Sequence, residues 1–172
     1  PKFNVNEDGS IGERNTVTCG SIEHKMGIKA SATAVLNFDK AKGYLIGPEN
    51  KGLNCMFTFM NTARIGTAIQ GLTAAELAFQ GGLSYAKERL AMRALSGAKA
   101  PEQVADPIIV HPAVRNMVLT CKAFAEGGRA LVYYLSQFSD VVTKGEGETQ
   151  AYADQMLSFL TPIAKAFLTE TG

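Results

Sequence analysis

The chain has 172 residues, of which 17 are basic and 16 are acidic, so its formal net charge at neutral pH is +1. This length suits one domain, or parts of two, with a sizeable buried core. Balanced charge without a basic stripe argues against nucleic acid as a partner. We also expect no membrane span, since no apolar run reaches the roughly 18 residues that a bilayer requires, and no signal peptide pattern opens the chain.

Three cysteines, Cys19, Cys55 and Cys121, are an odd number at wide and irregular spacing. This arrangement fits neither a disulfide framework nor a zinc site, so we expect no metal. It suits a reducing compartment, and we expect the protein to be cytoplasmic. Because the first residue is Pro1 rather than Met, we also expect the chain to be a fragment.

The first part of the chain, residues 1–49, carries the signals of strands. Short β-prone runs are separated by glycines and by a predicted turn at Asp8-Gly9. We interpret this part as an antiparallel sheet belonging to a partial β-domain. The predicted strands are residues 2–6, 16–19, 33–38 and 43–47.

After Pro48 the apolar period changes from two to about 3.6, which predicts a helix of some forty residues and about 60 Å. So long a rod needs other helices or another subunit to pack against. Glycines within it lower helix propensity and either permit close helix approach or mark a break. They are Gly66, Gly71, Gly81 and Gly82, and the apolar face is Leu53, Met56, Phe57, Met60, Ala68, Leu72, Ala75, Phe79, Leu83, Ala86 and Leu90.

Residues 94–111 read as a linker, and Pro112 suits the first turn of a second helix. A polar turn at 144–148 precedes a third helical stretch, which Pro162 should break or kink. The apolar face predicted for this stretch is Tyr152, Met156, Leu160, Ile163 and Phe167. The predicted fold class is α+β, mainly α: a partial antiparallel β-domain, residues 1–49, followed by an incomplete up-down four-helix bundle, residues 50–172.

Arg64 is the most informative single residue. Helical spacing puts it on the face that carries Met60 and Ala68, where apolar side chains are expected. A guanidinium there needs an anionic partner or a water-filled cavity. It is either part of a buried structural ion pair, an exposed arginine where the face has drifted, or part of a ligand site.

Arg89 closes the same helix, where a cation that complements the helix dipole is ordinary. His111 precedes Pro112 at the start of the second helix, whose free N–H groups favour a nearby phosphate. The alternative interpretation of His111 is a partly exposed histidine in a loop. The sequence contains no metal-ligand cluster, phosphate-binding glycine loop or nucleophile elbow.

Several strings, in the same order and spacing, resemble those of acyl-CoA dehydrogenases. They are residues 25–33 (KMGIKASAT), 47–53 (GPENKGL), 59–64 (FMNTAR) and 85–89 (YAKER). Residues 5–10 (VNEDGS) and 111–115 (HPAVR) are similar to the longer subgroup related to 3-methylmercaptopropionyl-CoA dehydrogenase. The similarity runs through the whole chain, from the end of the middle β-domain into the C-terminal helical domain.

This resemblance implies a noncovalently bound FAD and an acyl-CoA substrate oxidised at its Cα–Cβ bond to a trans-2-enoyl-CoA. It implies a glutamate base that removes the α-proton, an electron-transfer flavoprotein as acceptor, and assembly as a homodimer or homotetramer. Carried over by position, Asn61 and Arg64 bind substrate, Arg89 contacts the FAD pyrophosphate of a neighbouring subunit, and His111 and Pro112 contact flavin.

Two departures limit the carry-over. Ala91 stands where the family often has a threonine near the cofactor. The family's glutamate base comes late in the sequence, so we expect it beyond Gly172, and the alternative position before the helix arginine holds Ala63. We therefore assign no catalytic residue to this chain and expect it to be inactive alone. A non-catalytic helical oligomerisation module with the same fold is the alternative, and an oxidase that reduces oxygen is a third possibility.

Overall fold

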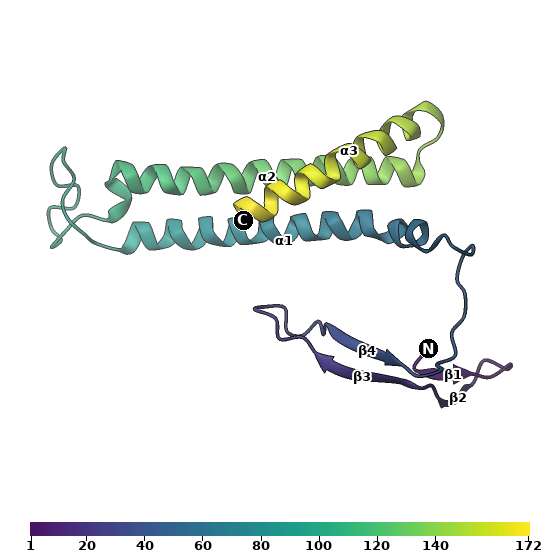
Figure 1. Ribbon diagram of the computed structural model, residues 1–172. Coiled ribbons are helices and arrows are strands. Elements are labelled where there is room, and N and C mark those ends of the chain that lie inside the picture. The colour runs from purple at the N-terminus through teal and green to yellow at the C-terminus, as the bar shows by residue number, and fades with distance from the viewer. The chain divides into compact units, whose positions relative to one another are not determined.

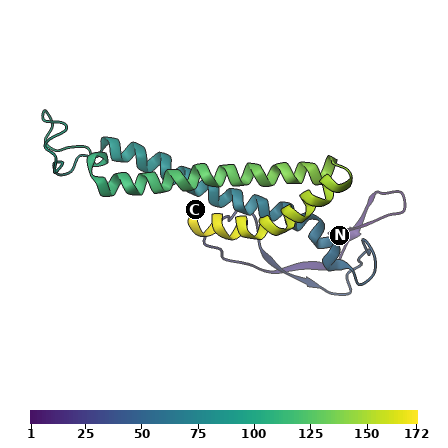
Figure 2. The ribbon, with the colours of Figure 1, turned by 90° about the horizontal axis from the view of Figure 1, so that it is seen from above.

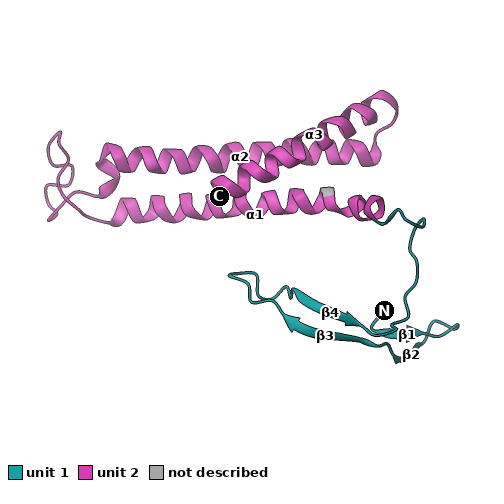
Figure 3. Ribbon diagram, in the orientation of Figure 1, with its two compact units in different colours: residues 1–52 teal, residues 53–172 magenta. Residues whose placement is uncertain are grey.

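A computed structural model describes residues 1–60 and 62–172 of the chain. These form two compact units, Pro1–Gly52 and Leu53–Gly172, shown in different colours in Figure 3. The first unit holds the strands and the second holds the helices, as labelled in Figure 1.

The β-unit contains two separate two-stranded sheets rather than the single sheet that we predicted. β1 (Phe3–Val5) pairs antiparallel with β2 (Ile11–Arg14), and β3 (Val17–Ile22) pairs antiparallel with β4 (Ala34–Phe38). Both pairings contain a register irregularity. Three of the predicted strands are confirmed, β2 is additional, and the strand predicted at 43–47 does not form.

Asn15 explains why the chain after β4 is not a strand. Its side chain is 5% exposed, and its Nδ2 donates to the carbonyl oxygens of Pro1 and Lys42 at 2.8 Å each. Its Oδ1 accepts from the Lys42 N–H at 3.0 Å. A side chain thus takes the place of a partner strand at Lys42, after a left-handed turn at Lys40 (φ 50°).

The helical unit consists of α1 (Gly52–Glu88), the short 3-10 helix η1 (Ile108–Val110), α2 (Pro112–Lys144) and α3 (Gly147–Thr171). Figures 1 and 2 show α1 and α2 running side by side in opposite directions, with α3 folding back along them. The predicted mainly α fold with three long helices in up-down order is confirmed. The loop between α1 and α2 extends beyond the ends of both helices in the two views.

The core lies where the three helices meet. Ala68 and Leu72 of α1 pack with Val132 of α2 and Leu168 of α3, and all four are less than one tenth exposed. A second cluster joins Leu135, which is fully buried, to the α3 residues Leu157 and Ala164. Burial of such side chains stabilises the bundle by about 25 cal/mol for each Å² of apolar surface removed from water.

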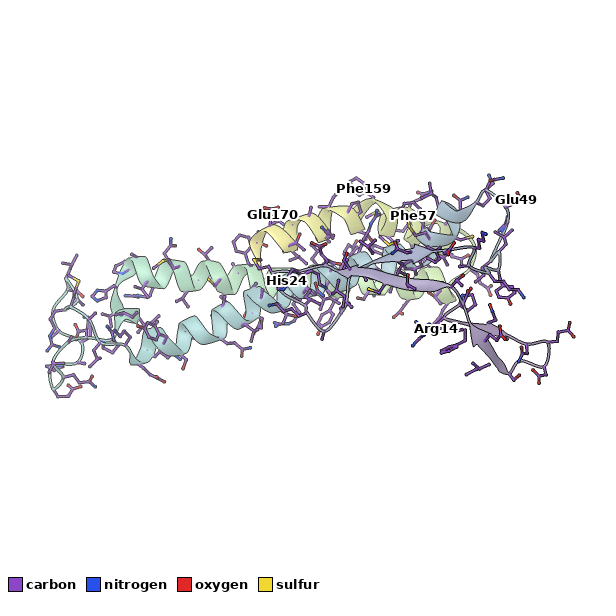
Figure 4. The ribbon with its side chains drawn as sticks, turned by 60° about the horizontal axis from the view of Figure 1, so that its bottom comes forward. Arg14, His24, Glu49, Phe57, Phe159 and Glu170 are labelled. Carbon is purple, nitrogen blue, oxygen red and sulfur yellow. The ribbon has the colours of Figure 1, made fainter. Side chains whose placement is uncertain are left out.

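The apolar face that we predicted for α3 is right only in part: Met156 and Leu160 are half-buried, and Leu160 packs against the second core cluster, but the other three residues are exposed. Tyr152, Ile163 and Phe167 are 57%, 50% and 44% exposed. Phe159 also stands out from the helix in Figure 4, at 64% exposed. The buried face is instead built on smaller side chains, namely Ala153, Leu157, Thr161, Ala164 and Leu168. Small residues let α3 approach its neighbours closely, which larger ones would prevent.

The predicted break at Pro162 does not occur, because α3 continues through it to Thr171. Proline removes one main-chain hydrogen bond from a helix interior. Here Thr161, directly before the proline, and Ala164, two residues after it, are 2% and 0% exposed, so tertiary packing holds the helix on both sides of the proline. The Thr161 hydroxyl donates to the Leu157 carbonyl oxygen at 2.6 Å.

An ion pair joins α1 and α2, and it gives a pH-dependent prediction. Arg129 donates to Glu76 at 2.5 Å. A hydrogen bond from Gln80, and then the Arg129 guanidinium, lower the pKa of Glu76 from its ordinary value. Since the folded pKa lies below the unfolded one, this contribution to stability is present above the unfolded pKa and is lost as the pH falls through the folded pKa. Glu76→Gln should therefore lower the urea midpoint near neutral pH but have little effect in acid.

The control is Glu126→Gln, which removes an exposed carboxylate 3.5 Å from Lys122 and should change the midpoint little at any pH. A stability loss in Glu76→Gln that stays constant down to acid pH would contradict the assignment, because it would then not depend on the ionised carboxylate.

Candidate functional site

Arg64, the predicted substrate contact on α1, is half-buried one helical turn before the fully buried Ala68. Its guanidinium carbon lies 5.6 Å from the centre of the Phe57 ring, a cation–π distance. Phe57 is 43% exposed, and Figure 4 shows it in the first turns of α1. No carboxylate of residues 1–60 or 62–172 lies within ion-pair distance of Arg64. The guanidinium is therefore neither neutralised in a filled core nor fully in solvent.

Asn61, the other predicted substrate contact, lies outside the described residues. Its role in binding substrate therefore stays a prediction.

Arg89 follows the last residue of α1, and its main chain is held on both sides. Its N–H donates to the Tyr85 carbonyl oxygen at 2.8 Å, which continues the helix, and its own carbonyl oxygen accepts from the Ile108 N–H at 2.8 Å. Its side chain is exposed, and no ion pair to it occurs in the described part of the chain. A fixed backbone thus carries a guanidinium that is available to an anion.

His111 and Pro112 form the entry to α2. His111 is half-buried, and its Nε2 lies 2.9 Å from the Ala91 carbonyl oxygen, so this nitrogen is the donor because a carbonyl can only accept. Pro112 occupies the first helical turn as predicted, and no acidic residue lies in that turn. His111 makes no side-chain cap, so the first N–H groups of α2 have no side-chain acceptor from the capping position.

The structure brings Arg89 and His111 together and keeps Arg64 apart. Ile108, three residues before His111, bonds to Arg89, and His111 itself bonds two residues beyond Arg89. Arg64 lies 25 residues earlier on the same helix, about 37 Å away along its axis. The predicted acyl and cofactor contacts therefore belong to two separate regions of the helical unit.

Asp106 and Arg93 organise the loop between the helices, and sequence reasoning missed both. Asp106 is 0% exposed, and its carboxylate accepts from the main-chain N–H groups of Ala94, Lys99 and Ala100 at 2.8 Å each. Arg93 donates to it at 3.1 Å. These bonds, with the Ala94 N–H first, hold the pKa of Asp106 far below its usual range. The available signal was an aspartate directly before Pro107 in a segment rich in small residues.

A shallow groove of about 260 Å³ lies beside the start of α2. Its apolar lining consists of Phe79 and Leu83 of α1, Val118 and Leu119 of α2, and Ile109 of η1. The cations Arg115 and Lys122 also line it. Apolar walls with cations at the edge suit a ligand that is partly apolar and negatively charged.

The residues at this end of the bundle fit the anionic part of a dinucleotide. Arg89 offers two parallel donors to a phosphate, and the start of α2 offers main-chain N–H groups without competing acidic side chains. In the described ranges, no three His, Cys, Asp or Glu side chains are grouped to hold a metal ion. No helix among the described residues is long and apolar enough to cross a membrane.

Comparisons with known proteins place the chain among proteins of one family. Residues 50–171 match the family described as acyl-CoA dehydrogenase, C-terminal domain. Over 170 residues the chain is 45% identical to 3-methylmercaptopropionyl-CoA dehydrogenase from Ruegeria pomeroyi, covering 99% of this chain and 28% of that protein. Over 182 residues it is 38% identical to a butyryl-CoA dehydrogenase from Syntrophomonas wolfei, covering 99% of this chain and 29% of that protein.

Among solved structures, butyryl-CoA dehydrogenase from Megasphaera elsdenii matches with a TM-score of 0.60 at 26% identity, covering 90% of this chain and 38% of that one. The chain spans less than a third of the length of the two curated relatives, 28% of one and 29% of the other.

Proposed function

Because the chain belongs to the acyl-CoA dehydrogenase family, we propose that it is part of a flavoenzyme that oxidises the Cα–Cβ bond of an acyl-CoA thioester to a trans-2-enoyl-CoA. The resemblance predicted from residues 25–33 and 85–89 is confirmed at the level of the family, including the subgroup of its longer members. The observation that carries the proposal is the un-neutralised Arg64 on an otherwise apolar helix face, at the position where the family contacts substrate.

We propose that Arg89 and the His111-Pro112 segment hold FAD, with the Arg89 guanidinium on the pyrophosphate. When bound, FAD supplies the hydride acceptor for the hydrogen that leaves the β-carbon. Arg89 contributes a charge-assisted hydrogen bond from a fixed main chain, and its phosphate partner belongs to the FAD of a neighbouring subunit. This explains why no carboxylate in the described residues pairs with it.

We propose that Asn61 and Arg64 line the acyl-CoA site. Proton removal from the α-carbon places negative charge on the thioester, and a nearby guanidinium with apolar neighbours such as Phe57 favours that charge. The base is not assigned to any residue here, because Ala63 stands at the position that a minority of the family uses. The 172-residue chain alone is therefore proposed to be inactive.

The proposed partners follow from the same family. We propose an electron-transfer flavoprotein as acceptor, a homodimer or homotetramer as the assembly, and the cytoplasm as the location, which suits three free cysteines. Large apolar side chains exposed on the helical unit, such as Leu77 at 67% and Phe159 at 64%, support an assembly that covers them.

The proposal is tested on the full-length protein in two steps. The purified protein should show flavin absorbance and oxidise an acyl-CoA in the presence of an artificial electron acceptor. Arg64→Ala should then keep its flavin but lose on the order of tenfold in kcat/KM for acyl-CoA, because one charge-assisted interaction with the thioester or its CoA is removed.

Gln70→Ala, an exposed change on the same helix, is the matched control and should leave both quantities unchanged. A colourless protein, without activity when FAD is added, would favour the non-catalytic oligomerisation module instead. A coloured protein in which Arg64→Ala oxidises acyl-CoA at the wild-type rate would remove Arg64 from the substrate site.

A further inference from the structure

We propose that Asp106 is a positioning residue for the cofactor site: its carboxylate folds the loop between α1 and α2 so that Arg89 and His111 are presented together. This role rests on the proposed function, because it concerns the proposed FAD contacts. Asp106 itself touches neither cofactor nor substrate in this assignment and acts through the main chain of its neighbours.

The side chain of Asp106 binds three main-chain N–H groups of the loop. One carboxylate oxygen accepts from the Ala94 N–H at 2.8 Å, and the other accepts from the N–H groups of Lys99 and Ala100 at the same distance. An ionised carboxylate is an acceptor at both oxygens, and it can therefore satisfy donors from both sides of a loop. A neutral amide at this position offers one acceptor oxygen and would leave at least one buried N–H unpaired.

Arg93 also binds this loop, through both the loop backbone and the Asp106 carboxylate. Its Nη1 donates to the Ala100 carbonyl oxygen at 2.8 Å and to the Asp106 carboxylate at 3.1 Å, and its Nη2 donates to the Gln103 carbonyl oxygen. Its side chain is 39% exposed, whereas that of Asp106 is fully buried. The charge of the buried carboxylate is thus balanced by an arginine that also binds the loop backbone.

The main chain of Asp106 connects this loop to the proposed site. Its N–H donates to the Met92 carbonyl oxygen at 2.9 Å, and its carbonyl oxygen accepts from the Ala91 N–H at 3.0 Å. Leu90 and Pro107 form the isolated antiparallel bridge of this short ladder. The Ile108 N–H then donates to the Arg89 carbonyl oxygen at 2.8 Å. One residue therefore anchors the loop by its side chain and the ladder beside Arg89 by its backbone.

Both proposed cofactor contacts depend on this ladder. Arg89 is fixed to α1 through Tyr85 and to the ladder through Ile108. His111 bonds to the carbonyl oxygen of Ala91, whose N–H is bonded to Asp106. Release of Asp106 would loosen residues 91–108 and let Arg89 and the start of α2 move independently. A displacement of about 1 Å in a binding group is enough to weaken its interactions greatly.

The experiment measures FAD binding to the full-length apoprotein by flavin fluorescence titration. Asp106→Asn should raise the Kd for FAD on the order of tenfold, because a preorganised contact becomes mobile. Asp140→Asn removes an exposed carboxylate from α2 and is the matched control, which should bind FAD like the wild type. An unchanged Kd in Asp106→Asn would overturn the proposal.

A double-mutant cycle separates positioning from a general loss of structure. Because Asp106 is proposed to position Arg89 as well as His111, the loss of FAD affinity that Asp106→Asn causes should be clearly smaller in the Arg89→Ala background than in the wild type. An equal loss in both backgrounds would overturn the positioning role. If Asp106→Asn does not fold, Arg93→Gln keeps the carboxylate and its three N–H bonds, and a smaller rise in Kd with the same dependence on Arg89 is then expected. Independence from Arg89 would again overturn the role.

Limited trypsin digestion provides a readout that does not require flavin. Arg93 and Lys99 lie inside the loop, and cleavage after them should become faster in Asp106→Asn than in Asp140→Asn. Faster cleavage with an unchanged Kd would refute positioning while the proposed function stands. If Arg89→Ala alone binds FAD like the wild type, the proposed cofactor contact itself fails, and this variant identifies that failure separately.

Discussion

Replacing Arg89 with alanine is expected to weaken FAD binding by the full-length protein on the order of 10- to 100-fold, the range for losing hydrogen bonds from a charged group. The main chain of Arg89 is hydrogen-bonded to Tyr85 on one side and to Ile108 on the other, so the backbone that carries the guanidinium is fixed in place. Its exposed side chain has no carboxylate partner in the described part of the chain. The effect should therefore come from the ligand and not from a lost internal ion pair.

Lys87→Ala is the matched control, because Lys87 is an exposed cation in the last turn of α1, two residues before Arg89. Side chains two positions apart on a helix point in different directions. Lys87 therefore adds positive charge to the same end of α1 but cannot make the contact with FAD that is proposed for Arg89. Equal losses of FAD affinity in both variants would show that only the overall positive charge matters. Raising the salt concentration should then abolish both effects.

The long helices could be predicted because their signal is local. Apolar residues between 53 and 90 recur with the helical period, and α1 indeed spans Gly52–Glu88. Pro112 also marked the first turn of α2 correctly, since proline lacks the N–H that this position does not use. Such features depend on neighbours three or four residues away, which the sequence displays directly.

The packing of α3 could not be predicted in the same way. The largest apolar side chains suggested a face through Tyr152, Ile163 and Phe167, whereas the structure buries Ala153 and Ala164. How closely two helices approach decides which face is buried, and that distance depends on glycines and alanines in partners far away in the sequence. The large side chains then remain on the outside, where another chain segment or subunit can cover them.

The residues of the candidate site also differ in whether the sequence could predict them. Arg64 was identified by a charge on an apolar helix face, and Arg89, His111 and Pro112 by their positions within family strings. Asp106 was not identified, because its bonds run to main-chain N–H groups 6 to 12 residues away. Such bonds have no periodicity and require no particular side-chain partner. The sequence of residues 94–111 therefore predicts only a linker, and the role of Asp106 becomes visible only in the structure.

Gly71→Ala is expected to destabilise the helical bundle by about 1–3 kcal/mol, the usual cost of forcing extra volume into a packed interior. An added Cβ would lie 2.1 Å from the Leu168 carbonyl oxygen and 2.6 Å from its carbonyl carbon. These are main-chain atoms of α3, which cannot rotate away as a side chain would, so the helix itself must shift. That shift would withdraw Leu168, which is 2% exposed, from the cluster that joins the three helices.

Gly66→Ala in the same helix is the matched control, because an added Cβ there meets no atom within 4 Å. Alanine is a better helix former than glycine, so this variant should be about 0.5–1 kcal/mol more stable than the wild type. The two changes are chemically identical and differ in whether α3 lies against them. Urea unfolding followed by circular dichroism should therefore move the two midpoints in opposite directions. If both variants gained stability, the close approach of α1 and α3 at Gly71 would be wrong, and with it the packing that buries the small face of α3.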